Sequence, residues 1–190
     1  MESSYYVIRV TRVADAVLTH ARRAQEKEID QSRRRGGGTA VEVPPPNAWL
    51  FQSNPVLYDL RGALRSLNEQ VWSVSRYAKE IRTGDHVYLW EAGRRGGIAG
   101  LAEIIEPGRL QPEPPEQLPF ARDDEAFAGE RVRARLRVLR VIAPVIPRRT
   151  IVSCPELNAL GVLRCSRGTN FRLSRAERTA LDSVILNVTT

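Results

Sequence analysis

A pair of apolar runs joined by a glycine-rich connection, in residues 83–104, restricts the fold more than any other part of the chain. Residues 86–90 are β-branched and aromatic, and residues 98–105 are mostly Ile, Ala and Leu. The glycines between the two runs are typical of a turn. The pattern therefore predicts two neighbouring strands. Trp90, at the end of the first strand, is expected either to line a cleft beside the glycines or to fill the core of a barrel.

Further strands are predicted on both sides of this pair. Residues 48–52 and 71–74 have the composition of short strands, and residues 132–145 begin with apolar side chains that alternate with arginines, as in a half-buried strand. Residues 107–119 are rich in proline and predict an irregular loop. The outward face of the alternating strand would be a row of arginines, either solvated or facing phosphate: Arg131, Arg133, Arg135 and Arg137.

Two helices are predicted from apolar spacing and capping residues. Residues 55–67 carry leucines at helical intervals, with Ser53 or Asn54 in the capping position. The last helix would begin after Ser174, and Glu177, three residues later, would complete a capping box.

These elements predict an α+β fold in which about five or six strands curl into a small β-barrel surrounded by short helices. No strand–helix–strand alternation supports a doubly wound sheet. Residues 47–190 would form this main domain. Residues 1–46 would form an N-terminal extension, with a strand, a helix and a linker rich in Arg, Gly and Pro that is either solvated or in contact with phosphate.

The composition limits the classes of function. The 190 residues are 42% hydrophobic and 27% charged, as in ordinary globular proteins. No apolar run approaches the roughly 20 residues that span a bilayer, and no signal peptide is evident, so a cytoplasmic location without a membrane partner is expected. The net charge is +7, and every cation except Lys27 and Lys79 is arginine. This balance suits nucleic acid, although a GC-rich genome would also produce it.

No set of residues predicts an active site. The glycines of residues 93–100 match neither nucleotide-binding pattern, because a strand follows them. His20 and His86 lack partners at metal-binding spacing, and Cys154 and Cys165 form no disulfide framework. The chain is therefore expected to be a binding module without enzymatic activity, cofactor or metal. The aromatic residues have polar neighbours and could sandwich a planar base, although composition alone favours core packing for them.

Four motifs, in this order, resemble an EVE domain of the PUA superfamily: WLFQSNPVLYDL, VWSVSRYAKEIRTGDHVYLWEAG, GGIAGLAEI and RGTNFRLSRAE. The resemblance covers residue 47 to about residue 186. It is closest to EVE domains associated with McrB-type modification-dependent restriction systems. It implies a PUA-like curled barrel with a pocket for a modified nucleobase, similar in fold to YTH domains, which hold a methylated adenine in an aromatic cage.

The resemblance also implies roles for individual residues. Trp72 and Trp90 would flank the base, and Asn54 and Ser73 would meet its polar edge. The remaining base-binding residues implied by position are Ser53, Thr169 and Asn170, of which the last two could instead brace their loop. The flanking phosphates would be held by Arg76, Lys79, Arg94 and Arg95.

The resulting hypothesis is a non-catalytic reader that flips 5-methylcytosine or 5-hydroxymethylcytosine out of double-stranded DNA. It would act as a monomer and as the specificity module of a restriction or defence system. Because the chain has no GTPase or nuclease domain, cleavage would need a separately encoded nuclease or GTPase partner. The alternative is a PUA-type RNA-binding module for tRNA or a modified RNA base. A weaker option is a binder of small molecules or nucleosides.

Overall fold

A six-stranded mixed sheet organises the computed structural model, which describes residues 45–190 except residues 75, 166 and 190. From residue 46 onward they belong to one compact unit, Pro46–Thr190. The strand predicted at residues 5–10 and the helix predicted at residues 13–29 lie outside the described residues. The strands are β1 (Ala48–Ser53), β2 (Glu69–Ser73), β3 (His86–Glu91), β4 (Gly97–Gln111), β5 (Arg131–Pro147) and β6 (Asn170–Leu173).

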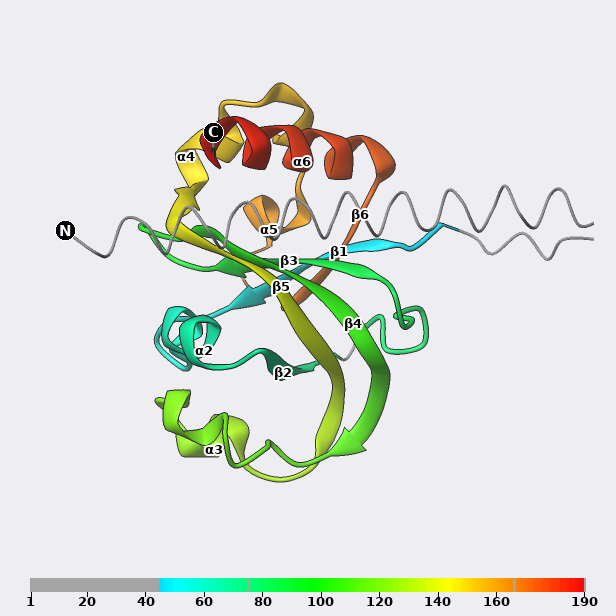
Figure 1. Cartoon of the computed structure of the whole chain (residues 1–190), viewed down its shortest axis with the longest axis vertical. Helices are drawn as coiled ribbons and strands as arrows, with labels where there is room; N and C mark the ends of the chain where they lie inside the picture. Colours follow the sequence, from blue (N-terminus) through cyan, green and yellow to red (C-terminus); the bar gives the residue numbers. More distant parts are fainter. Residues whose placement is uncertain (1–44, 75, 166, 190) are drawn as a thin grey trace, which may run out of the picture. The chain divides into compact units, whose positions relative to one another are not determined.

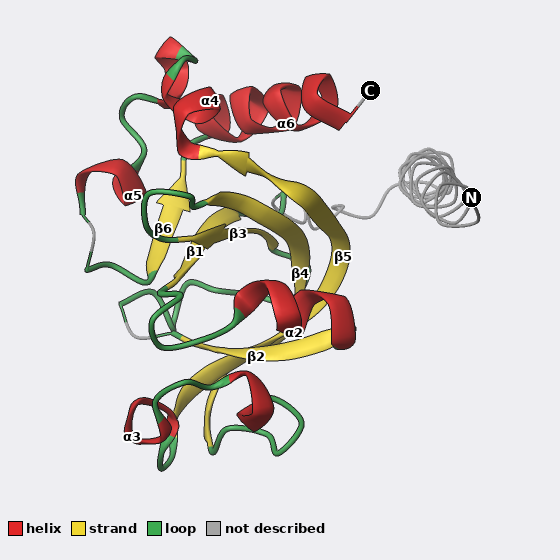
Figure 2. Ribbon diagram, turned by 90° about the vertical axis from the view of Figure 1, so that its left-hand side faces the viewer, coloured by secondary structure: helices red, strands yellow, loops and turns green. Residues whose placement is uncertain are grey.

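The sheet has the order β2-β5-β4-β3-β1-β6. Only β1 and β3 run parallel, and every other neighbouring pair is antiparallel. Figures 1 and 2 show β4 and β5 as long strands that bend together, so that the β2 end of the sheet curls away from β6. The bend accompanies several register shifts between β4 and β5, and such bulges increase the local twist of a strand.

The strand pair predicted around the glycines is confirmed. β3 and β4 pair in antiparallel register from His86↔Glu103 to Glu91↔Gly97. The turn between them needs glycine at two positions. Gly93 has a φ of +97°, and a Cβ on Gly97 would lie 1.9 Å from the carbonyl oxygen of Ile146. β4 continues to Gln111, beyond the predicted end of the strand, so the proline-rich loop is shorter than expected.

The sheet does not close into the predicted barrel. In the described part of the chain, β2 pairs only with β5 and β6 pairs only with β1. Side chains rather than backbone hydrogen bonds join the curled ends. The rings of Trp72 on β2 and Phe51 on β1 lie 5.9 Å apart, and those of Trp49 and Tyr77 lie 5.2 Å apart. The interior of the curl is therefore packed, although its edges remain open.

Two core clusters lie on opposite faces of the sheet. Side chains alternate along β1, so Trp49 and Phe51 belong to the cluster inside the curl, while Ala48 and Leu50 belong to the cluster on the other face. Burying a large apolar side chain contributes about 1.5–3 kcal/mol, so both clusters stabilise the fold. Both faces of the sheet are thus covered.

The helices divide between these two faces (Figures 1 and 2). On one side lie α4 (Arg148–Val152), α5 (Gly161–Arg164) and α6 (Arg175–Thr189), with the 3₁₀ turn η2 (Pro155–Leu157) packed on α6. On the other side lie α2 (Leu60–Ser66) and α3 (Asp124–Phe127), with the 3₁₀ turn η1 (Leu118–Phe120) against α2. This second side is where the candidate site forms.

One helix start is confirmed and one is corrected. At α6, Glu177 N–H donates to Ser174 Oγ and Ser174 N–H donates to Glu177 Oε2, which is the predicted capping box. The helix predicted from residue 55 begins only at Leu60, with Asp59 as its cap. The reason is that Asn54 caps a turn and not a helix, since its Oδ1 accepts from Val56 N–H two residues on.

Candidate functional site

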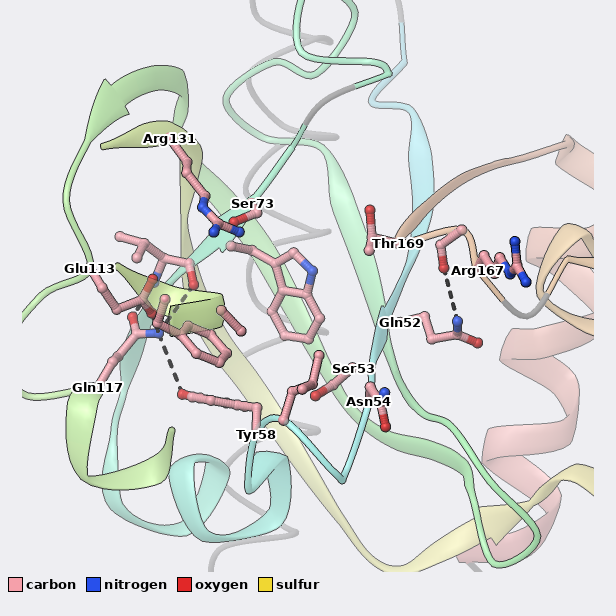
Figure 3. A pocket seen from close by; sticks show the side chains of 16 residues that line it. Gln52, Ser53, Asn54, Tyr58, Ser73, Glu113, Gln117, Arg131, Arg167 and Thr169 are labelled. Atoms are coloured by element: carbon pink, nitrogen blue, oxygen red, sulfur yellow. Dashed lines mark hydrogen bonds between the residues drawn. The ribbon is translucent and has the colours of Figure 1, made fainter. Parts of the chain in front are cut away.

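A pocket of about 450 Å³ lies where the end of β1, strand β2, the loop before α3 and the loop before β6 come together. Figure 3 shows its polar side chains. Glu113 and Gln117 lie on one side, while Thr169, Gln52 and Arg167 lie on the other. The remaining lining residues are Ser53, Asn54, Leu57, Tyr58, Val71, Trp72, Ser73, Ala126, Phe127, Arg131 and Gly168.

Three aromatic residues from separate elements line the pocket. Trp72 comes from β2, Tyr58 from the turn before α2, and Phe127 from the end of α3. The rings of Tyr58 and Phe127 pack 5.5 Å apart. Trp72 is half-buried, in contrast to the sealed core indole Trp49. The pocket thus offers apolar π surfaces that a planar ligand can contact.

Gln117 attaches the proline-rich loop to β2. Its Oε1 accepts from Val71 N–H, and its Nε2 donates to the carbonyl oxygen of Val71 at 3.2 Å. The amide therefore bonds both backbone groups of this residue, as a neighbouring strand would. The same Nε2 lies 2.9 Å from Glu113 Oε1 and 3.4 Å from the hydroxyl of Tyr58. Gln117 thereby joins two polar groups of the pocket to the sheet.

Glu113 forms an ion pair that is almost closed to solvent. Arg133 Nε donates to Glu113 Oε2 at 2.7 Å, and the side chains are 1% and 6% exposed respectively. The Arg133 guanidinium also donates to the carbonyl oxygens of Gln111, Gly129 and Phe127. Burial raises the pKa of Glu113, and Arg133 opposes that rise. The ion pair connects β5 to the loop that carries Glu113 and Gln117 of the pocket lining.

The arginines of β5 do not form the outward row that alternation predicts. Arg133 is fully buried, whereas the apolar Val132 is 38% exposed. Arg131 lines the pocket, Arg135 forms ion pairs with neighbouring carboxylates, and Arg137 is exposed. The reason for the correction is the loop before β5, which folds back over this face of the strand and covers Arg133.

The opposite wall of the pocket is anchored to β1 through Gln52. Its backbone N–H donates to the carbonyl oxygen of Thr169 at 2.8 Å, and its Nε2 donates to that of Gly168 at 2.9 Å. Phe171 packs against this loop so closely that a Cβ on Gly168 would lie 2.5 Å from the ring. The loop can therefore take this position only because residue 168 is a glycine, without a side chain.

Five of the predicted base-binding residues meet at the pocket: Ser53, Asn54, Trp72, Ser73 and Thr169. Asn170 does not line it. Its side chain is buried below Thr169, whose hydroxyl it accepts at 3.1 Å, and its Nδ2 finds no partner among the described residues. Asn170 therefore lies outside the pocket lining, next to Thr169 in the same loop.

Trp90 does not form the second wall, which corrects the prediction from resemblance. It is 3% exposed and lies in the core cluster on the other face of the sheet, with Tyr88 and Ile98. Alternation along β3 is the reason, since Leu89 takes the position inside the curl and Trp90 points away from it. Tyr58 and Phe127 supply the aromatic surface beside Trp72 instead.

The predicted phosphate-binding residues are exposed but outside the lining. Arg76 and Lys79 follow β2, and the Arg76 guanidinium lies 5.4 Å from the ring of Tyr77. Arg94 and Arg95 lie in the β3–β4 turn, which is joined to the pocket's Ser53 by a hydrogen bond from Ala92 N–H. Two other arginines line the pocket directly: Arg131, from the row on β5 that could face phosphate, and Arg167, for which no role was predicted.

Sequence reasoning missed Glu113 and Gln117 because they lie in a proline-rich loop that suggested no regular structure. It missed Tyr58 because the turn before α2 was taken as the first turn of a helix. The alternation of β5 gave no signal for them, because it placed Arg133 on the outward face, where it needs no buried partner. Glu113 and Gln117 belong to none of the four motifs, whereas Tyr58 lies within the first of them.

Membrane-spanning helices and metal-binding clusters are both absent from the described residues. Among the described helices, none has the length and apolar character to cross a membrane. In residues 45–190, with the gaps given above, no three His, Cys, Asp or Glu side chains gather to hold a metal ion.

The EVE domain family matches residues 47–182 of the chain. No curated protein matches the sequence. A hypothetical protein from Leishmania major is 16% identical with a TM-score of 0.57, covering 76% of this chain and 98% of that chain. A protein from Pseudomonas putida is 20% identical with a TM-score of 0.54, covering 73% and 99%. Human THYN1, solved in complex with DNA containing 5-methylcytosine, is 16% identical with a TM-score of 0.52, covering 73% and 97%. At these identities the structures share the fold.

Proposed function

This chain belongs to the EVE domain family, and from that premise we propose that its pocket binds a modified cytosine flipped out of double-stranded DNA. The observation that carries the proposal is the half-buried indole of Trp72, which lines a pocket of about 450 Å³ together with Tyr58 and Phe127. A flipped base needs apolar faces against its ring and polar groups at its rim, and this pocket offers both.

The free energy gained by stacking a base in this pocket is similar in size to the cost of extruding it from the duplex. Extruding a base from a duplex costs a few kcal/mol, and stacking on an aromatic side chain returns about 1–3 kcal/mol per base. Trp72 alone would offset much of that cost. Hydrogen bonds from rim groups would supply the remainder, and Ser53, Asn54, Ser73 and Thr169 all lie at the pocket.

Cationic side chains around the pocket support binding to a polymer rather than to a free nucleoside. Arg131 and Arg167 are exposed and line the pocket, where phosphates flanking a flipped base would pass. The exposed Arg94 and Arg95 lie in the adjoining turn, and Arg76 and Lys79 follow β2. An arginine guanidinium can donate two parallel hydrogen bonds to one phosphate. The net charge of +7 also favours association with DNA.

The choice of a methylated cytosine is supported by the human relative, which was solved with DNA containing 5-methylcytosine. 5-Hydroxymethylcytosine is the other modification included in the proposal. The domain itself would perform no chemical step. It would act as a monomeric specificity module of a restriction or defence system, and a separate nuclease or GTPase would cut the DNA.

A binding titration tests the proposal. Duplexes that differ only in 5-methylcytosine, 5-hydroxymethylcytosine or cytosine at one position are compared at a fixed salt concentration, together with single-stranded RNA and DNA of the same sequence. Tighter binding to a modified duplex is expected. Equal affinity for modified and plain duplexes would refute the modified-cytosine proposal. Tighter binding to RNA than to DNA would favour a PUA-type RNA-binding module instead.

A further inference from the structure

The orientation of the Glu113 carboxylate is fixed by two donors. Gln117 Nε2 donates to Oε1 at 2.9 Å, and Arg133 Nε donates to Oε2 at 2.7 Å. Both donors are themselves held in place, Gln117 by the two backbone groups of Val71 and Arg133 by three carbonyl oxygens. The carboxylate therefore cannot turn without breaking several bonds to buried groups.

Both oxygens of Glu113 consequently act as acceptors. An ionised carboxylate has about four lone-pair positions, and the two donors use one on each oxygen. Glu113 also lines the pocket, so a remaining acceptor position is available to a ligand there. A ligand carbonyl at this point would meet another acceptor, whereas a ligand N–H would be satisfied.

Tyr58 lies beside Glu113, and its hydroxyl can donate a hydrogen bond, whereas the ionised Glu113 carboxylate can only accept one. Its hydroxyl oxygen lies 3.4 Å from the same Gln117 Nε2, whose two hydrogens point to the closer oxygens of Val71 and Glu113. Within the described residues the hydroxyl proton has no acceptor. Burial raises the pKa of Tyr58, so the phenol keeps its proton at neutral pH. The pocket thus presents an acceptor next to a donor.

We propose that Glu113, with Tyr58, selects an amino-bearing pyrimidine, so that the flipped base is of the cytosine type and not thymine or uracil. This inference rests on the proposed function. Cytosine carries an amino donor at position 4 beside a ring-nitrogen acceptor at position 3, which matches Glu113 and Tyr58 in that order. Thymine carries the reverse, a carbonyl beside a ring N–H. Because 5-methylcytosine and thymine have the same shape and the same methyl group, a protein can distinguish them only by the polar groups at positions 3 and 4.

A mismatched duplex gives the sharpest test with the unaltered protein. Four duplexes carry 5-methylcytosine, cytosine, thymine or uracil opposite the same guanine. A mismatched base costs less to extrude, so a pocket that recognised only shape and methyl would bind T·G at least as tightly as 5-methylcytosine·G. We expect 5-methylcytosine to bind about tenfold to a hundredfold more tightly than thymine.

The outcomes separate this inference from the proposed function. If 5-methylcytosine and thymine bind equally well, and both better than cytosine and uracil, methyl recognition stands and the role of Glu113 is refuted. If all four duplexes bind equally, the proposed function itself fails.

A variant gives an independent measurement. Glu113→Gln places an amide nitrogen against either Gln117 or Arg133, so the correct acceptor pattern is lost. We expect the ratio of 5-methylcytosine to thymine affinity to fall to within about threefold of unity, while salt-dependent background binding persists. Glu116→Gln, an exposed change in the same loop, is the matched control and should keep the ratio. An unchanged ratio in a folded Glu113→Gln protein overturns the inference, and if that variant does not fold, the four-duplex comparison decides.

Discussion

Arg133 Nε lies 2.7 Å from Glu113 Oε2, and this ion pair joins the long strand β5 to the loop that carries Glu113 and Gln117 of the pocket lining. The Arg133 side chain is 1% exposed, and the Glu113 side chain, which lines the pocket, is 6% exposed. Removing one partner would leave the other charged, buried and uncompensated. The stability of the domain and the shape of its pocket therefore depend on the same pair.

We expect Arg133→Met to lower the free energy of unfolding by about 3–5 kcal/mol, because Glu113 would remain buried without its counterion. The double variant Arg133→Met/Glu113→Leu should be less destabilised than the sum of its single variants, since both charges are removed. Urea unfolding of the four proteins measures this coupling. Strictly additive losses would show that the pair is not energetically coupled.

Replacing the pocket indole should abolish discrimination without unfolding the domain. Trp72→Ala removes a half-buried ring from the pocket, and we expect its loss of preference for the methylated duplex to correspond to about 1–3 kcal/mol. The control is Trp90→Phe, which alters the core on the other face of the sheet. That variant should be less stable but equally selective. A Trp90→Phe protein that loses selectivity while Trp72→Ala keeps it would reverse the assignment of the two indoles.

The arginines at the pocket should control the salt dependence of binding. Each of Arg131→Gln and Arg167→Gln is expected to reduce the slope of log affinity against log salt by about one unit, as loss of one phosphate contact does, for methylated and plain duplexes alike. Arg137→Gln, an exposed change farther along β5, is the control. If Arg76→Gln and Lys79→Gln change the slope and the pocket arginines do not, the DNA backbone follows β2 instead.

His86 should make the domain less stable in mild acid. Arg178 can only donate, so His86 Nδ1, 3.0 Å from its guanidinium, must be the unprotonated acceptor. Burial, and then the charge of Arg178, lower the pKa of His86 below 6.5. His86 has a pKa of 6.5 in the unfolded chain and a lower pKa in the folded chain. At pH values between these two, the unfolded chain binds a proton that the folded chain does not, so the free energy of unfolding falls as the pH decreases through this window.

His86→Gln is expected to remove that contribution, because an amide oxygen can still accept from Arg178 but does not titrate. The free energy of unfolding at pH 7.5 and pH 5.5 would be compared for the two proteins, with a difference in pH response of at most about 1.4 kcal/mol per pH unit. The same pH response in both proteins would exclude His86 as its source.

A single methyl group at Gly168 should displace the loop that carries Thr169. The new Cβ would lie 2.5 Å from the Phe171 ring, so either the ring or the loop must move. We expect Gly168→Ala to cost about 1–3 kcal/mol in stability and to weaken binding of the methylated duplex. Gly168→Ala/Phe171→Leu, which frees space for the methyl group, should recover part of the binding. No recovery would indicate that the loop position does not depend on this contact.

Local chemistry explains which parts of the fold could be predicted. The β3–β4 pair follows from its glycines, and the α6 capping box from Ser174 and Glu177, since each depends on residues close in sequence. The roles of Glu113 and Gln117 could not be predicted, because Gln117 contacts Val71 across 46 residues of sequence. Trp90 was misplaced for a different reason. Both faces of the sheet are buried, so the apolar run of β3 does not show whether Leu89 or Trp90 faces the pocket.

The amide of Gln117 also has a consequence for the solution behaviour of the protein. The outer edge of β2 would otherwise present the N–H and C=O of Val71 to any passing extended chain, and exposed edges of this kind promote aggregation. Gln117 occupies those groups and so protects the domain against edge-to-edge self-association. Since the same side chain orients Glu113, a substitution at this position would alter the pocket and expose the strand edge together.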